Sequence, residues 1–347
     1  MRLVFLGCGK IAAAHAKRLR RHARDVTVGF ASRDPARAQA FARRLGGAAH
    51  GSYEAAIADG GVDAVAVVTP PASHLPLALA ALAAGKHVVL EKPPVPRASD
   101  FDAVAAAAAR AGRQVLVAEN YHYKPLLERL RRLLAERAIG DVLFVHANAI
   151  KQQRSADWRA DPALALGGAL YEGGIHWIDF MATLGPEVRA VRGFRPAPPA
   201  TAAAGERAPE RSMERPMERS MERSMMVGFE YEGGAVGMLS YSWEVPSTAK
   251  GLRLSKIYGR EGSITFESNG LWALCHGRKT RLYVPGLRDL SGYRAMWADF
   301  VRALTTGAPP RMTLAQARRD LELVEQAYAT ADATDAPPSP PSPPEVP

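Results

Sequence analysis

Lys92 stands where a side chain could move a proton. It lies in the segment Glu91-Lys92-Pro93-Pro94, directly after an apolar run typical of a buried strand. Open α/β sheets bind ligands at the carboxyl ends of their parallel strands, and the flanking Glu91 and Pro93 favour a fixed geometry there. An ammonium in that position can hydrogen-bond a substrate hydroxyl and assist the loss of its proton. We therefore interpret Lys92 as a catalytic residue rather than a surface lysine in a loop.

His176 is a second group that could exchange protons. It follows Glu172 by four residues and precedes Asp179 by three, and on one helix both spacings share a face. A carboxylate one turn away can orient an imidazole and stabilise its charged form. Gly173 and Gly174 are costly inside a helix, which indicates a close approach there. We predict that His176 is a general acid/base positioned by Glu172. The alternative is a structural histidine, and no further residues suggest the ligand set of a metal site.

A glycine-rich turn follows the apolar run 3–6. Its residues, Gly7-Cys8-Gly9-Lys10-Ile11-Ala12, read G-x-G-x-x-A. The first glycine permits a tight turn, the second lets a pyrophosphate approach the backbone, and Ala12 lets helix and strand pack closely. The N-terminus of the helix that follows attracts anions. We predict a dinucleotide-binding turn, in which Cys8 is a packing residue rather than a nucleophile.

The end of the second strand-like run bears on the choice of cofactor. An acidic residue there would bind the ribose 2′-hydroxyl of NAD. The sequence has Ser32 and Arg33 instead, a hydroxyl and a guanidinium that suit a 2′-phosphate. Asp34, which precedes a proline, is interpreted as a helix cap. NADP(H) is therefore favoured and NAD(H) stays possible. Thr69-Pro70, at the end of another strand, are expected at the same ligand-binding edge.

Apolar runs and helical spacing alternate through residues 1–120. We expect strands over 3–6, 26–31, 64–68, 87–90 and 114–118, and helices over 11–21, 35–45, 73–84 and 99–111. The strand runs are short and continuously apolar, as in a parallel sheet buried on both faces. Residues 1–120 are therefore predicted to form a doubly wound α/β domain of the Rossmann type.

The pattern changes over residues 121–334. Helices are expected over 125–137, 168–184, 293–305 and 314–329, and strands over 142–150, 227–231, 235–243, 252–258, 263–267, 271–276 and 281–284. Consecutive strands with tight turns predict an α+β domain with an open, mostly antiparallel sheet and helices on one side. Residues 196–225 contain a Met-Glu-Arg repeat and are interpreted as a low-complexity, solvated insertion rather than a methionine-lined docking helix. Residues 335–347 are predicted to form a disordered Pro-rich tail.

Composition narrows the class of protein. A chain of 347 residues suits about two domains, and 47% hydrophobic with 23% charged residues is ordinary for a globular protein. No run approaches the ~18 apolar residues of a membrane helix, and no secretory signal is recognised, so a cytoplasmic protein without a membrane partner is expected. Two cysteines exclude a disulfide framework. The net charge of +10 comes from scattered basic residues, so no nucleic-acid partner is expected.

Taken in order, these segments resemble the Gfo/Idh/MocA family of NAD(P)-dependent oxidoreductases over residues 1–195 and 226–331. The resemblance implies that Lys92 and His176 are catalytic. It also implies that His74, Glu91 and Asn120 lie at the cofactor, and that Tyr121, Tyr123 and Asp179 contact substrate. The family commonly has an aspartate where Glu172 stands, which implies an altered fit to the substrate.

The resemblance also implies an activity and an assembly. The activity is hydride transfer between nicotinamide and a secondary alcohol or ketone of a sugar, cyclitol or related polyol. The assembly is a homo-oligomer, a dimer or tetramer, formed through the C-terminal sheet. Two other activities stay open: glycoside cleavage through transient oxidation with NAD, and a non-catalytic, NAD(P)-binding regulatory role.

Overall fold

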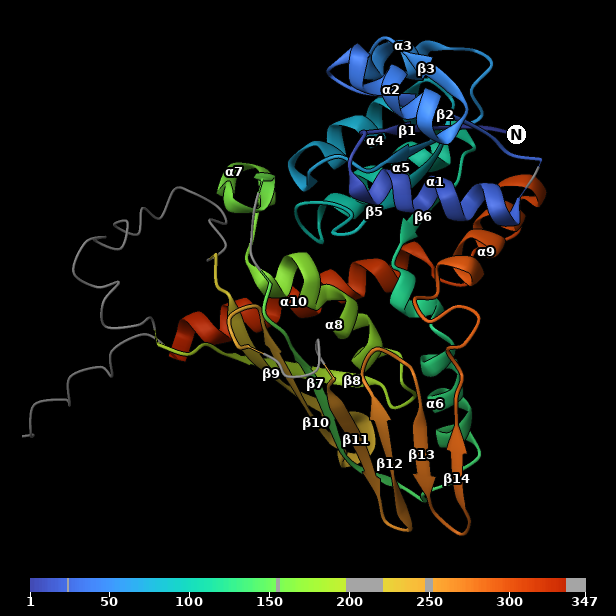
Figure 1. The fold of residues 1–347 in the computed structure, drawn as a ribbon. Coiled ribbons are helices and arrows are strands. Elements are labelled where there is room, and N and C mark those ends of the chain that lie inside the picture. The colour runs from blue at the N-terminus through green and yellow to red at the C-terminus, as the bar shows by residue number, and fades with distance from the viewer. Residues whose placement is uncertain (24, 154–156, 198–220, 247–251, 335–347) are drawn as a thin grey trace, which may run out of the picture.

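Two sheets organise the protein. The computed structural model describes residues 1–23, 25–153, 157–197, 221–246 and 252–334. In Figure 1 the six-stranded sheet of the N-terminal residues lies above a larger, eight-stranded sheet. All strand pairs of the first sheet are parallel, and most pairs of the second are antiparallel. The predicted fold class is confirmed.

The smaller sheet has the strand order β3-β2-β1-β4-β5-β6. Its strands are β1 (Arg2–Leu6), β2 (Thr27–Ala31), β3 (Ala48–His50), β4 (Ala64–Val67), β5 (His87–Glu91) and β6 (Val115–Ala118). Its helices are α1 (Lys10–His22), α2 (Pro35–Leu45), α3 (Tyr53–Ala58), α4 (His74–Ala83) and α5 (Asp100–Ala111). Every residue of β4 and β6 is buried, which explains why these strands are continuously apolar. The strand order reverses between β1 and β4, so a crevice is expected at their carboxyl ends.

Two short elements of this sheet were not predicted. Strand β3 has three residues, none of them fully buried, and α3 has six residues. An edge strand of Ala-Ala-His offers no apolar run, and a helix of one and a half turns shows no clear periodicity. The local signal is therefore too weak to identify either element.

The larger sheet has the order β14-β13-β12-β11-β7-β10-β9-β8. Its strands are β7 (Val142–Ile150), β8 (Val188–Phe194), β9 (Ser224–Tyr231), β10 (Val236–Ser242), β11 (Leu254–Gly259), β12 (Gly262–Glu267), β13 (Ala273–His276) and β14 (Thr280–Tyr283). Strand β7 pairs with β10 in parallel. Strand β8 was not predicted because two exposed arginines interrupt its apolar residues. Strand β9 begins before the predicted run 227–231 and includes Ser224 and Met225, which the sequence assigned to the insertion.

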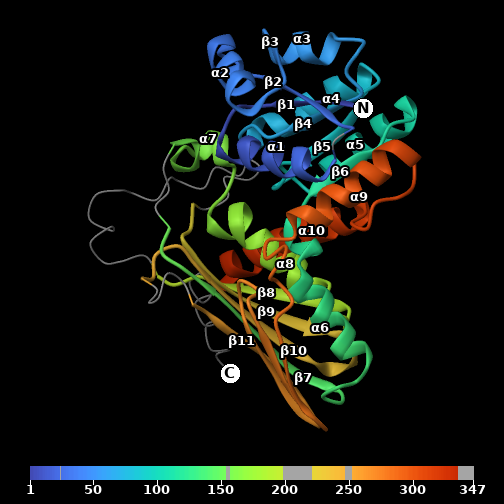
Figure 2. The same cartoon turned by 45° about the vertical axis from the view of Figure 1, so that its right-hand side comes forward.

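Helices cover one face of the larger sheet. Figure 2 shows α6 (Pro125–Ala135), α8 (Ile175–Ala182) and α10 (Leu314–Thr334) on that face, and no described helix on the other. The short α7 (Pro162–Ala165) lies away from the sheet, beside the N-terminal domain. The predicted helix 168–184 is divided: a π-helical turn, Leu170–Gly174, leads directly into α8.

Helix α9 (Tyr293–Thr306) packs against α1 of the smaller sheet. Its Trp297 is buried, and its indole Nε1 donates to His15 Nδ1 at 3.1 Å. Helix α9, from near the C-terminus of the chain, therefore packs onto the N-terminal domain.

Two predicted features lie outside the described residues: most of the Met-Glu-Arg repeat (213–220) and the Pro-rich tail (335–347). Among the helices that the structure does describe, none combines the length and the apolar character that crossing a membrane requires.

Candidate active site

One cavity of about 1320 Å³ brings residues of both sheets together. Most of the predicted site residues line it: Gly7, Cys8, Gly9, Lys10, Ile11, Ser32, Arg33, Thr69, Pro70, Glu91, Lys92, Tyr121, Glu172 and His176. Lys92 follows β5 and His176 lies on α8, so the two predicted proton-transfer groups meet from opposite halves of the fold.

The glycine-rich turn at this cavity fits a pyrophosphate. Gly7 has a φ of +117°, and a Cβ there would lie 2.9 Å from the carbonyl oxygen of Val68. Gly9 is the N-cap of α1 and offers no side-chain cap, and a Cβ on it would meet no atom within 4 Å. The first N–H groups of α1 therefore face open space beside the cavity, where an anion can accept from them. Ala12 is fully buried against the sheet, and burial raises the pKa of the Cys8 thiol to about 11, consistent with a packing role.

Two exposed arginines follow β2, Arg33 in the connection to α2 and Arg37 in the first turn of that helix. Arg33 and Arg37 both line the cavity, and Arg37 Nε donates to the carbonyl oxygen of Cys8 at 2.9 Å. Asp34 accepts from Ala36 N at 3.0 Å, so its predicted role as the helix cap of α2 is confirmed. Arg37 was not predicted as a site residue, although it follows Arg33 by one helical turn.

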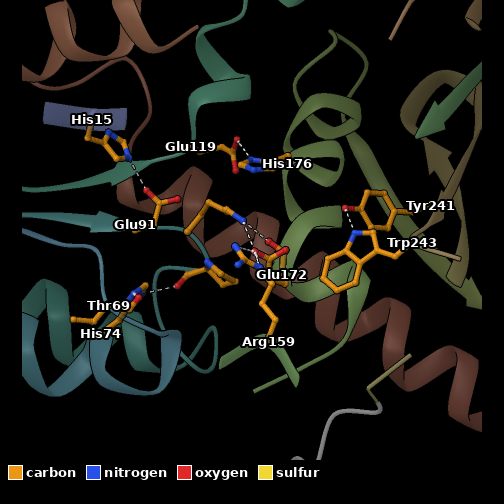
Figure 3. A network of polar contacts seen from close by, with 12 residues as sticks. His15, Thr69, His74, Glu91, Glu119, Arg159, Glu172, His176, Tyr241 and Trp243 are labelled. Atoms are coloured by element: carbon orange, nitrogen blue, oxygen red, sulfur yellow. Dashed lines mark hydrogen bonds and ion pairs between the residues drawn. The ribbon is translucent and has the colours of Figure 1, made fainter. Parts of the chain in front are cut away.

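Lys92 and Glu172 form an ion pair at the centre of the cavity. Lys92 Nζ donates to the carbonyl oxygen of Glu172 at 2.5 Å and lies 3.4 Å from Glu172 Oε1. The same Oε1 accepts from Arg159 Nε at 3.1 Å and lies 3.0 Å from Arg159 Nη2 (Figure 3). Burial raises the pKa of Glu172, but the charges of Lys92 and Arg159 outweigh it and lower the pKa to about 2. Glu172 is therefore a carboxylate that holds the Lys92 ammonium.

His176 has a different carboxylate partner from the one predicted. Its Nδ1 lies 2.5 Å from Oε1 of Glu119, the residue after β6 (Figure 3). Its ring stacks on that of Tyr121 with 4.5 Å between centroids. The prediction that Glu172 orients His176 is wrong. Glu172 lies in a π-helical turn and His176 in α8, and because the π-helical turn is wider than an α-helical one, side chains four residues apart do not share a face here. Gly173 is needed because a Cβ there would collide with the Tyr241 hydroxyl.

Burial sets the protonation of the His176–Glu119 pair. It lowers the pKa of His176 well below the ordinary value, and the nearby Lys92 ammonium lowers it further. Burial also raises the pKa of Glu119 to about 7, although its hydrogen bond from Tyr121 N opposes this. At neutral pH the imidazole is therefore uncharged and able to accept a proton.

Glu91 is fixed by a chain of two hydrogen bonds from α9. Because an indole N–H only donates, His15 Nδ1 accepts from Trp297 and His15 Nε2 carries the hydrogen that Glu91 Oε2 accepts at 2.8 Å. Burial raises the pKa of Glu91, but the hydrogen bond from His15 and the charge of the nearby Lys92 ammonium outweigh it and leave the pKa below its ordinary value. Glu91 is thus a positioned carboxylate beside Lys92.

Several implied site residues lie behind the cavity wall rather than on it. His74 is buried, with its ring nitrogens 2.8 Å from the carbonyl oxygens of Thr69 and Pro93. Asn120 is buried and donates to the Ser291 carbonyl oxygen. Both support the cavity without lining it.

The expectation that Tyr123 and Asp179 contact substrate requires correction. Tyr123 is buried and donates to Asp299 at 2.9 Å, and Asp179 is buried beside His122 Nδ1 at 3.0 Å. The i, i+3 spacing does not bring Asp179 to the cavity, because that side chain faces the helix-packed interior.

Comparison with known proteins identifies the family. One family model, described as "Oxidoreductase family, NAD-binding Rossmann fold", matches residues 1–119, and another, "GFO/IDH/MocA C-terminal domain", matches residues 127–265. The chain belongs to the GFO/IDH/MocA oxidoreductase family. The resemblance seen in the sequence is confirmed.

Two of the relatives are named as sugar oxidoreductases. D-xylose 1-dehydrogenase (NADP(+)) 2 of Haloferax volcanii is 30% identical over 309 residues, which cover 87% of this chain and 89% of that protein. The dTDP-3,4-didehydro-2,6-dideoxy-alpha-D-glucose 3-reductase of Streptomyces violaceoruber is 36% identical over 202 residues, 56% of this chain and 57% of that protein. The crystal structure of GenD2 from gentamicin A biosynthesis, in complex with NAD, has a TM-score of 0.80 at 26% identity and covers 96% of this chain and 95% of that one.

Sequence reasoning missed further residues of this candidate site, chiefly Glu119, Lys151, Arg159 and Arg253. Glu119 follows β6 of the parallel sheet, so the strand-end argument that singled out Lys92 applies to it, whereas Lys151 follows β7 of the mostly antiparallel sheet, where that argument does not hold. Arg159 and Arg253 carry no local signal. Within the described ranges, no group of three or more His, Cys, Asp or Glu side chains is arranged to hold a metal ion.

Proposed function

We propose that this oxidoreductase catalyses reversible hydride transfer between nicotinamide and a secondary alcohol or ketone of a sugar, cyclitol or related polyol. The observation that carries the proposal is the shared cavity, in which Lys92 and the His176–Glu119 pair stand beside the glycine-rich turn. The named sugar dehydrogenase and reductase relatives support the substrate class.

The roles of the side chains follow from their partners. When bound, a nicotinamide supplies the acceptor for the hydride that leaves the alcohol carbon. With Glu119 ionised, His176 Nδ1–H donates to it, and the lone pair of Nε2 is free to accept the hydroxyl proton. Lys92, held by Glu172, donates a hydrogen bond to the same substrate oxygen. The reverse reaction returns the proton from His176 to the alkoxide.

The cofactor preference follows from charge at the end of β2. Arg33 and Arg37 give two guanidiniums at the cavity wall, and no acidic residue occupies the position of Ser32. A 2′-phosphate matches this pair of cations. NADP(H) is therefore the favoured cofactor, with NAD(H) as the alternative.

The experiment is a screen of sugars and cyclitols with NADP⁺ and NAD⁺, followed by the absorbance of the reduced nicotinamide. On the best substrate, Lys92→Ala and His176→Ala should each lower kcat by about 10² or more while NADP(H) binding is nearly unchanged. Lys17→Ala, on the exposed face of α1, is the matched control. Undiminished turnover in both variants would contradict the proton-transfer roles proposed for Lys92 and His176.

We propose that the helix-free face of the larger sheet binds a second copy of this chain. Exposed apolar side chains from seven of its strands share that face: Phe144, Phe194, Met226, Val236, Leu254, Leu274 and Leu282. So large an apolar surface is typical of a protein interface. Phe144→Glu should shift the protein toward monomer in light-scattering measurements. The domain boundaries at 120 and 334 and the cytoplasmic location stay predictions.

A further inference from the structure

The C-terminal half of the cavity is rich in cations. Lys151 and Arg253, from the larger sheet, line it together with Lys92 and Arg159. Among the described residues, two buried carboxylates line the same cavity, Glu172 and Glu91, and of these the charge of Glu172 acts on Lys151.

The carboxylates other than Glu172 that line the cavity either accept hydrogen bonds from neighbouring groups or are exposed to solvent. Glu91 is held by His15, Asp34 and Asp161 cap α2 and α7, and Asp157 is exposed to solvent. The buried part of the cavity therefore carries excess positive charge.

Lys151 is the least compensated of these cations. It follows β7, where its backbone N donates to the Ser242 carbonyl oxygen at 2.9 Å. Its side chain is half-buried, and Nζ has neither a hydrogen-bond nor an ion-pair partner within the described part of the chain. Burial lowers the pKa of Lys151 to about 8; the Glu172 charge opposes this, and the cations Arg253, Lys92 and Arg159 add to it. The ammonium remains charged at neutral pH, and a buried charge without a partner is costly unless a ligand supplies one.

Arg253 adds a donor of fixed geometry on the same wall. Its residue is 8% exposed, and Nη2 donates to Asn269 Oδ1 at 2.5 Å. A guanidinium is planar and always charged, and it binds paired oxygens with a fixed geometry. Because the glycine-rich turn and Arg33 lie on the N-terminal domain, the phosphates of a dinucleotide do not account for Lys151 and Arg253.

We propose that the substrate is an acidic sugar, whose anionic oxygen group is bound by Lys151 and Arg253 while its reacting hydroxyl faces Lys92 and His176. This inference rests on the proposed function for the identity of the reacting hydroxyl, but not for the binding of the anion. The shared chemistry is a carboxylate or a phosphate on the sugar, and the experiment separates the two.

The test measures binding by calorimetric titration of the full-length protein saturated with NADP(H). The probes are matched sets in the gluco, galacto and manno series: the neutral hexose, the hexuronate and the hexose 6-phosphate. We expect the tightest ligand to be acidic and to bind at least about tenfold more tightly than its neutral counterpart. A higher affinity of the uronate or of the phosphate ester identifies the anion.

Lys151→Gln should bring the affinity for the acidic ligand to within about twofold of that for the neutral one, because only the acidic ligand loses an ion pair. Lys279→Gln, in the exposed β13–β14 turn, is the matched control, and thermal unfolding verifies that both variants are folded. The inference is overturned if a neutral hexose binds most tightly, if no acidic sugar binds, or if Lys151→Gln leaves the preference intact. Hydride transfer is recorded separately by absorbance, so acid-selective binding without turnover would reject the proposed function alone.

Discussion

Replacement of Glu119 by glutamine tests the proton-transfer geometry directly. Glu119 is 2% exposed and lies 2.5 Å from His176 Nδ1, and its pKa is raised to about 7 by burial. When Glu119 is ionised it accepts from Nδ1–H, and Nε2 is free to act as a base. When Glu119 is protonated its O–H donates to Nδ1 instead, the ring hydrogen moves to Nε2, and His176 cannot accept the substrate proton.

The magnitude follows from this titration. The kcat/KM for alcohol oxidation should be constant above neutral pH and fall about tenfold per pH unit below the Glu119 pKa, to about 30-fold below the plateau at pH 5.5. In Glu119→Gln the amide oxygen still accepts from Nδ1–H but does not titrate, so this acid limb should disappear. The plateau should fall by about 10- to 150-fold, because a charge-assisted hydrogen bond of ~1.5–3 kcal/mol is weakened.

The assay is the initial rate of nicotinamide reduction from pH 5 to 9 at subsaturating substrate. Glu136→Gln, at the exposed end of α6, is the control and should keep the wild-type profile. An acid limb near neutral pH that persists in Glu119→Gln would refute the reasoning, because another group would then control the protonation of His176.

Two further predictions concern the cofactor site and its support. Arg33→Ala combined with Arg37→Ala should weaken NADP(H) binding by at least about tenfold, since each lost ion pair to a phosphate removes ~1 kcal/mol or more. NAD(H) binding, measured by the same fluorescence titration, should be nearly unchanged. Equal weakening of both cofactors would contradict the proposed contact with the 2′-phosphate. Trp297→Phe leaves His15 Nδ1 without its donor and should lower the free energy of unfolding by about 1–3 kcal/mol in urea denaturation, with a smaller loss for Trp297→Phe in a His15→Leu background. Additive losses in the two variants would indicate that the indole contributes by packing alone.

Local sequence was sufficient to identify the N-terminal half of the candidate site. The turn from Gly7 to Ala12, the Asp34 cap and Lys92 after β5 each depend on a strand, a turn or a helix start that neighbouring residues specify. Backbone conformation and amphipathic period are local properties, so apolar runs and glycine spacing identify them. The predicted bounds fail mainly at β3, α3 and β8, where the local pattern is short or interrupted by exposed arginines.

Tertiary structure alone decided which charges meet. Glu119 and His176 are 57 positions apart, and Lys92 and Glu172 are 80 apart. The sequence analysis identified His176 and Glu172 as site residues but predicted a contact between them, because spacing along one helix is the only proximity that sequence reveals. In the structure the π-helical turn places their side chains apart. His176 contacts Glu119, which follows β6, and Glu172 contacts Lys92, which follows β5. Charge pairing across a cavity depends on how two sheets are packed together, and spacing along one helix does not contain that information.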